Sequence, residues 1–241
     1  MIDTPPKKSD LGVRTLSAAV MLAVSGTALW LGGWWWTVFV AAAALGVLWE
    51  WWGLTCGITL KPVNRAFWNL LGFGYVGIAA FILSRLGFTY DNFLRGISLI
   101  GAVIATDIGA YFAGRTFGGP KIAPSISPSK TWSGLIGGML GAAIAIGASG
   151  AAMRGTILCF EVEGSCTSNR DLMLEALVVG ALIAIVAQTG DFFESWMKRR
   201  AGVKDSGNLI PGHGGLFDRV DGLLAVCFVI GLFMLAMRVL G

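Results

Sequence analysis

Long apolar stretches separated by short polar segments dominate this chain. We identify seven such stretches, over residues 14–31, 34–53, 66–84, 96–114, 133–153, 172–190 and 222–240. A helix needs about 20 mostly apolar residues to cross the roughly 30 Å hydrocarbon core of a bilayer. The pattern therefore predicts an all-α integral membrane protein, a polytopic bundle of about seven transmembrane helices. Residues 1–13 are predicted to form a polar tail, and residues 14–241 a single transmembrane domain.

Composition agrees with a membrane protein. Charged residues make up 13% of the chain, whereas soluble domains carry about 25%, and the mean hydropathy is +0.73. The 35 glycines favour close helix packing in lipid. The net charge of +4 does not indicate nucleic acid, because the basic residues flank the apolar stretches. Anionic lipid headgroups or nucleotide phosphates are the expected partners there.

The charge distribution predicts an orientation. If the N-terminus is cytoplasmic, 13 Lys and Arg residues fall on the cytoplasmic side and 5 on the other, which follows the positive-inside rule. Seven spans then place the C-terminus outside. Cys159 and Cys166 fall in the outer segment 154–171, where oxidation is permitted. We hypothesise a disulfide between them, with two free thiols as the alternative.

The segment 191–221 is charged and rich in glycine, unlike its apolar surroundings. It contains five Lys or Arg, five Asp or Glu, and the only histidine, His213. Polar groups concentrated at the mouth of a membrane span are costly to keep there, so they indicate a functional site.

Carboxylates from three predicted spans reach the same side of the membrane. Asp107 lies near the end of the fourth span, Asp191 closes the sixth, and Asp218 and Asp221 open the seventh. Like charges in a low dielectric repel one another unless a cation neutralises them. Mg²⁺, which binds one or two carboxylates together with phosphate oxygens and water, is the expected ion. The alternative is structural salt bridges, Asp191 with Lys198 or Asp218 with Arg219.

Basic and flexible residues surround these acids. Lys198, Arg199, Lys204 and Arg219 suit phosphate binding, and the glycines of the segment allow backbone N–H groups to approach phosphate. For His213 we favour hydrogen bonding or positioning over proton abstraction, since a substrate phosphate is already ionised; a purely structural role is the alternative.

The segment 115–132 is the second polar insertion. Its prolines predict a stiff loop that leads into a helix beginning at 131–133. Arg115, Ser127, Ser129 and Lys130 suit anion capture at that helix start. Ordinary capping by Ser129 or Thr131 is the alternative.

One run of residues is similar to a known signature. Ser195-Trp-Met-Lys198-Arg199, then Lys204-Asp205 after four residues, then Pro211-Gly-His213-Gly-Gly-Leu-Phe-Asp218-Arg219-Val-Asp221, resembles the 27-residue signature of the phosphatidate cytidylyltransferases, or CDP-diacylglycerol synthases. Gly190-Asp191, Asp107 to Arg115, and Ser127 to Gly134 also resemble that family. The matching stretches cover roughly the C-terminal three fifths of the chain.

The resemblance implies an integral membrane enzyme that joins CTP and phosphatidate to give CDP-diacylglycerol and pyrophosphate. It implies dependence on Mg²⁺ and on a second cation, for which K⁺ is a candidate. It also implies a homodimer that lies in the inner membrane of a bacterium, with the active site facing the cytoplasm. Many bacterial relatives are longer at the N-terminal end, and Ser129 stands where many have lysine. Carried onto this sequence, the resemblance implies that Asp191 and Asp218 hold metal with Asp221 close by, that Lys198, Arg199, Lys204 and Arg219 contact phosphates, and that Ser127, Ser129 and Lys130 belong to the substrate pocket. With the reasoning from the residues added, the expected catalytic residues are Asp191, Lys204, His213, Asp218 and Asp221; the expected metal ligands are Asp107, Asp191, Asp218 and Asp221; and the expected substrate-binding residues are Arg115, Ser127, Ser129, Lys130, Ser195, Lys198, Arg199, Asp205 and Arg219.

Three other functions are weighed against this one. A CTP-dependent polyprenol or dolichol kinase would use similar groups, and product analysis would separate the two. The alcohol phosphatidyltransferases carry D-G-x-x-A-R, whereas Asp221-Gly222 is followed here by Leu-Leu-Ala-Val. A transporter would need acidic residues distributed along a path through the bilayer, and here they gather on one side.

Overall fold

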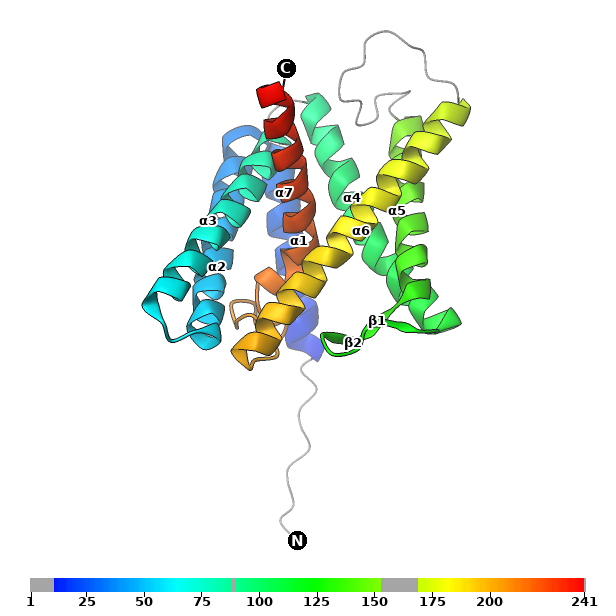
Figure 1. The fold of residues 1–241 in the computed structure, drawn as a ribbon. Coiled ribbons are helices and arrows are strands. Elements are labelled where there is room, and N and C mark those ends of the chain that lie inside the picture. The colour runs from blue at the N-terminus through cyan, green and yellow to red at the C-terminus, as the bar shows by residue number, and fades with distance from the viewer. Residues whose placement is uncertain (1–10, 88–89, 153–168, 241) are drawn as a thin grey trace.

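Long helices form the body of the protein (Figure 1), and the described part of the chain contains seven of them. The computed structural model describes residues 11–87, 90–152 and 169–240. In chain order the helices are α1 (Leu11–Leu31), α2 (Gly33–Ile58), α3 (Pro62–Arg85), α4 (Tyr90–Phe117), α5 (Trp132–Ala152), α6 (Asn169–Ala201) and α7 (Phe217–Leu240). Over the described residues, seven helices are long and apolar enough to cross a membrane. The predicted all-α integral membrane fold is confirmed.

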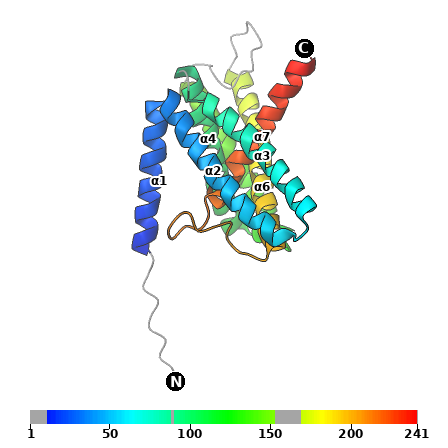
Figure 2. The same cartoon turned by 90° about the vertical axis from the view of Figure 1, so that its left-hand side faces the viewer.

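The helices alternate in direction, so both polar segments reach the same end of the bundle (Figure 1). This end, called the hairpin end below, contains a small β-hairpin and the loop of residues 202–216. Helix α1 stands at the edge of the bundle beside α2 (Figure 2). It begins at Leu11, so the last residues of the predicted tail are helical. Cys159 and Cys166 lie outside the described residues, and their disulfide stays a prediction.

The segment 115–132 contains the hairpin, where the sequence indicated a loop. Strands β1 (Lys121–Ala123) and β2 (Ser127–Thr131) pair antiparallel, with Lys121 opposite Thr131 and Ala123 opposite Ser127. Both strands lie at an edge, where the prolines of this segment are tolerated. Helix α5 begins as predicted, and the Gly134 N–H donates to Thr131 Oγ1 at 3.1 Å. Thr131 therefore caps this helix, as the alternative interpretation held.

Helix α6 is longer than its apolar stretch. It continues past residue 190 to Ala201 and has three basic residues in its last turn, where positive charge stabilises a helix C-terminus. Helix α7 begins at Phe217, before the predicted start at residue 222. Asp191 and Lys198 therefore lie on the last turns of α6, and Asp218 and Asp221 on the first turns of α7.

A close approach brings these two helix segments together. A Cβ atom on Gly190 of α6 would lie 2.5 Å from Ala225 Cβ and 2.7 Å from the Asp221 carbonyl oxygen of α7. Real Cβ atoms essentially never come this close, so the crossing needs a glycine at position 190. The crossing sets the carboxylate of Asp191, one residue later, beside that of Asp221.

An aromatic cluster fixes α2 against α6 and α7 near the hairpin end. Trp51 is 1% exposed, and its ring centroid lies 5.9 Å from that of Phe193 on α6 and 5.7 Å from that of Phe217 on α7. Its indole N–H donates to the Trp68 carbonyl at 3.0 Å, which satisfies its polar atom. The start of α7 is thus held by buried packing.

Candidate active site at the hairpin end

Three carboxylates converge where α6 crosses α7. Oxygens of Asp191, Glu194 and Asp221 all lie within 4.8 Å of one another. Asp191 and Glu194 are three residues apart on α6 and share a face of that helix. We call these three residues the acidic cluster. Ser195 donates its hydroxyl to Asp191 Oδ1 at 3.3 Å.

The acidic cluster fits a hard divalent cation. The Glu194 residue is 1% exposed, and its Oε1 has no hydrogen-bond partner within the part of the chain that the structure describes. A buried carboxylate oxygen without a partner is costly. A cation bound by carboxylate oxygens removes that cost, and Mg²⁺ prefers such ligands.

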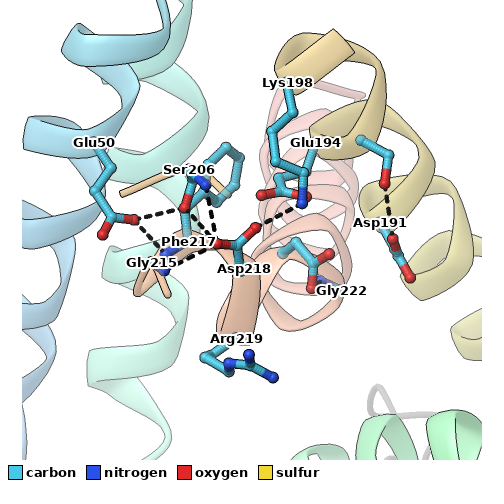
Figure 3. Close-up of polar contacts among 12 residues, drawn as sticks. Glu50, Asp191, Glu194, Lys198, Ser206, Gly215, Phe217, Asp218, Arg219 and Gly222 are labelled. Carbon is cyan, nitrogen blue, oxygen red and sulfur yellow. Dashed lines mark hydrogen bonds and ion pairs between the residues drawn. The ribbon is translucent and has the colours of Figure 1, made fainter. Parts of the chain in front are cut away.

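Asp218 lies next to the acidic cluster and is held by four donors (Figure 3). Its Oδ1 accepts from Lys198 Nζ at 2.6 Å. Its Oδ2 accepts from the Ser206 N–H at 3.0 Å, the Ser206 hydroxyl at 3.1 Å and the Gly215 N–H at 3.0 Å. Lys198 also pairs with Glu194 at 2.5 Å. Glu194, and not Asp218, completes the group of three, and a metal-binding role for Asp218 stays a prediction.

The ion pairs of the site differ from the alternatives drawn from sequence. Asp191 pairs with Lys130 of β2, not with Lys198. Asp218 pairs with Lys198, while Arg219 points away from that pair (Figure 3) and donates to the His213 carbonyl at 2.5 Å. Residues adjacent in sequence point to different sides of a helix, so Asp218 and Arg219 do not face each other.

Glu50 on α2 supports the site from the other side. It is 3% exposed and accepts from the Leu216 and Phe217 N–H groups, each at 2.8 Å, and from the Ser206 hydroxyl at 2.9 Å. The first N–H groups of a helix have no partner within the helix, and a negative charge there is favourable. A Cβ on Gly215 would lie 2.7 Å from Glu50 Oε2. Glycine at 215 is therefore needed for this approach.

Sequence reasoning missed Glu50 and Glu194. Glu50 is the only acidic residue between positions 11 and 90, and an isolated carboxylate within an apolar span is itself a signal of function. Glu194 lies one helical turn from Asp191 and from Lys198, a spacing that becomes visible once α6 is extended beyond residue 190.

A pocket of about 480 Å³, with charged and polar residues in its lining, lies between α4, β2, α5 and α6. We call it the hairpin pocket; its lining includes Asp107, Tyr111, Arg115, Ser129, Lys130, Thr131 and Gln188. Lys130 connects the pocket to the acidic cluster through its ion pair with Asp191. Asp107 is within electrostatic range of Lys130 and Asp191, and of Asp221. Ser127 is buried at the start of β2.

The remaining predicted residues lie in or near the loop 202–216. Lys204 and Asp205 are exposed and, together with Gly53, Gly57 and Asn208, line a second pocket of about 380 Å³, which we call the loop pocket. Arg199 is exposed on the last turn of α6. His213 Nδ1 lies 2.8 Å from the Ser17 hydroxyl. This hydrogen bond ties the loop to α1.

Taken together, the fold and the site define an integral membrane protein whose charged groups converge at one end of the bundle. The chain belongs to the cytidylyltransferase family, whose model matches residues 53–237. It is therefore a nucleotidyltransferase, in agreement with the signature resemblance.

Similar bacterial proteins cover most of the chain. A protein of Brucella suis biovar 1 (strain 1330) is 35% identical, with 93% of each chain covered. One from Rickettsia bellii (strain RML369-C) is 34% identical, with 95% of this chain and 94% of that protein covered. A Haemophilus influenzae (strain ATCC 51907 / DSM 11121 / KW20 / Rd) protein is 35% identical over 73% of this chain and 62% of its own length. All three are named phosphatidate cytidylyltransferase.

Proposed function

We propose that this protein transfers a cytidylyl group from CTP to phosphatidate, giving CDP-diacylglycerol and pyrophosphate. The observation that carries the proposal is the acidic cluster, with Lys130 and Lys198 paired to it, at one end of a membrane-spanning bundle. The names of the similar proteins support the choice of substrates. The site stands at the end of membrane-spanning helices, where a soluble nucleotide and a lipid headgroup can meet.

Mg²⁺ is the cation proposed for this site, with Asp191, Glu194 and Asp221 as its protein ligands. Bound there, it would neutralise charge on the phosphate oxygens as the reaction proceeds. Asp107 and Asp218 flank the three ligands, and we propose that they hold a second cation or orient the first ligands. K⁺ is the candidate for that second ion.

The reaction we propose is an in-line displacement. A phosphate oxygen of phosphatidate forms a bond to the α-phosphorus of CTP, while the bond from that phosphorus to pyrophosphate breaks. The phosphate of phosphatidate is anionic at neutral pH, so the step needs no strong base. The protein supplies position and positive charge. Lys130 and Lys198 lie at the cluster, and the exposed Arg199, Lys204 and Arg219 are placed to receive the leaving pyrophosphate.

The hairpin end is proposed to face the cytoplasm of a bacterium, with the protein in the inner membrane. Basic residues gather at this end on α4, the hairpin, α6 and the loop, which is the distribution that the positive-inside rule favours. CTP would then reach the site directly. We also propose a homodimer, which a mass measurement in detergent would test.

The experiment is an assay of the purified protein with phosphatidate, Mg²⁺ and CTP labelled at either the α or the γ phosphorus. We expect the α label to enter the lipid fraction and the γ label to leave as pyrophosphate, with EDTA stopping both. A γ label on the lipid would identify a kinase and contradict the proposal. A lipid fraction without either label would also contradict it.

A further inference from the structure

We propose that the hairpin pocket binds the phosphate of the lipid substrate, and that the Gln188 carboxamide is a specificity-determining donor to that phosphate. This inference rests on the proposed function and adds to it, because it assigns the two substrates to two different pockets. CTP would occupy the loop side of the acidic cluster.

Gln188 provides the first argument. It is 4% exposed, lies on α6 one turn before Asp191 and lines the hairpin pocket. Its Nε2 has no hydrogen-bond partner among residues 11–87, 90–152 and 169–240. Gly138 of α5 leaves room for this amide, since a Cβ there would lie 3.1 Å from Nε2. Buried donors are nearly always paired, so the amide points to a ligand that supplies an acceptor.

The charge of the pocket provides the second argument. Arg115 and Lys130 contribute two cations to the lining, against one carboxylate, Asp107. Arg115 Nη1 donates to the Tyr111 hydroxyl at 2.7 Å, which fixes the guanidinium beside the pocket. Two cations and an unpaired amide suit a group that has only acceptors, and an ionised phosphate monoester is such a group.

The position of the hairpin pocket along a membrane span is the third argument, and it favours a lipid over a nucleotide. The α4 residues that line the pocket lie within the candidate span Phe93–Phe117. Nearby on α4 and α5, Ile108, Phe112 and Ile136 are 52%, 63% and 58% exposed, and they offer apolar surface to acyl chains. Cytosine and ribose carry many polar groups that are costly to bury at this depth.

The loop pocket takes its charged residues from a loop, whereas Asp107 and Arg115 of the hairpin pocket lie on α4. Lys204, Asp205 and Asn208 are exposed and lie in the loop between the candidate spans, where water and a soluble nucleotide have access. Ion pairs and hydrogen bonds connect the acidic cluster to both pockets. Lys130 of the hairpin pocket pairs with Asp191. On the other side, Lys198 pairs with Glu194 and Asp218, and Asp218 accepts from the Ser206 N–H of the loop. This arrangement places the two reacting phosphates on either side of the acidic cluster.

The test measures KM for phosphatidate and KM for CTP separately in each variant. Gln188→Glu replaces the donor by a negative charge, and we expect KM for phosphatidate to rise by about tenfold or more, since a hydrogen bond to a charged group is worth about that factor. KM for CTP should stay within about twofold. Asn64→Asp makes the same amide-to-carboxylate change at an exposed position on the first turn of α3, and neither constant should move.

Arg115→Met tests the same pocket in a variant that leaves the buried Gln188 unchanged. Arg115 is exposed, so its loss leaves the core intact, and it should raise KM for phosphatidate in the same selective way. A selective rise in KM for CTP, or no rise for either substrate, would overturn the pocket assignment. A wild-type protein that forms no CDP-lipid would instead overturn the proposed function.

Discussion

Glu50 and Ser206 are 156 positions apart in the chain, yet the Ser206 hydroxyl donates to the Glu50 carboxylate at 2.9 Å. The same hydroxyl lies 3.1 Å from Asp218 Oδ2. A buried acid of the second helix is therefore one side chain away from the signature aspartate of the seventh. The candidate site depends on α2 as well as on the segment 191–221 that carries the signature.

The Glu50→Gln substitution tests this support. The new carboxamide would keep one acceptor oxygen and place an NH₂ group against backbone donors at the start of α7. Because a hydrogen bond to a buried charge is worth about 1.5–3 kcal/mol, we expect a loss of stability of that order and a slower turnover. Thermal unfolding in detergent measures the first and the cytidylyl-transfer assay the second. Glu175→Gln, at an exposed position of α6, is the matched control, and equal melting temperatures for the two variants would contradict the role of Glu50.

Gly215→Ala tests the close approach of the loop to α2. The added methyl would come 2.7 Å from Glu50 Oε2 and 2.8 Å from the backbone nitrogen of Gly207. We expect the loop to shift and turnover to fall by at least about tenfold, because a small misplacement of catalytic groups has large effects. Gly26→Ala, where nothing lies within 4 Å of the new methyl, should retain activity. A fully active Gly215→Ala protein would show that the loop geometry is not required.

Lys198→Met tests the ion pairs between α6 and α7. The change keeps an unbranched side chain of nearly the same length but leaves the buried Glu194 and the half-buried Asp218 without their cation. Breaking a buried pair in this way costs about 3–5 kcal/mol, which chemical denaturation in detergent would detect. Adding Glu194→Gln to this variant should restore part of the stability. Lys121→Met at the exposed start of β1 is the control, and a Lys198→Met protein as stable as this control would contradict the assignment.

The metal dependence should distinguish the acidic cluster from Asp218. We expect Asp191→Asn, Asp221→Asn and Glu194→Gln each to raise the Mg²⁺ concentration that gives half-maximal activity and to lower turnover, because each removes a charged ligand. Asp218→Asn should lower turnover by orders of magnitude while leaving that concentration nearly unchanged, since its oxygens accept from Lys198, Ser206 and Gly215. A Mg²⁺ titration of the four variants is the measurement. A large shift for Asp218→Asn would instead make Asp218 a ligand of Mg²⁺.

Much of the fold followed from hydrophobic pattern alone. Apolar stretches of about 20 residues have few alternatives to a membrane span, and the start of α5 at Trp132 also followed from its capping residues. The end of α6 could not be predicted from the hydrophobic pattern. Asp191, Glu194 and Lys198 resemble a polar loop by composition, but their spacing of three and four residues is helical, and the ion pairs Glu194–Lys198 and Lys198–Asp218 become visible only in three dimensions.

The site residues that belong to the signature or to the family-like segments could be predicted from the sequence. Those that depend on contacts between distant parts of the chain could not. Asp191, Asp221, Lys130 and Lys198 were identified from sequence and come together in the structure. Glu50 could not be assigned a partner, because its bonds run to Ser206, Leu216 and Phe217 across a tertiary contact. Lys204 and Asp205 stand in a separate pocket, a separation that spacing along the chain does not reveal.

The carboxylate that holds the start of α7 precedes position 53, where the family match begins. A shortened protein cut at that boundary would keep every signature residue and still lose the group that orders the signature loop. The smallest working unit of this enzyme must therefore begin ahead of Glu50, with enough of α2 to carry that side chain into the core.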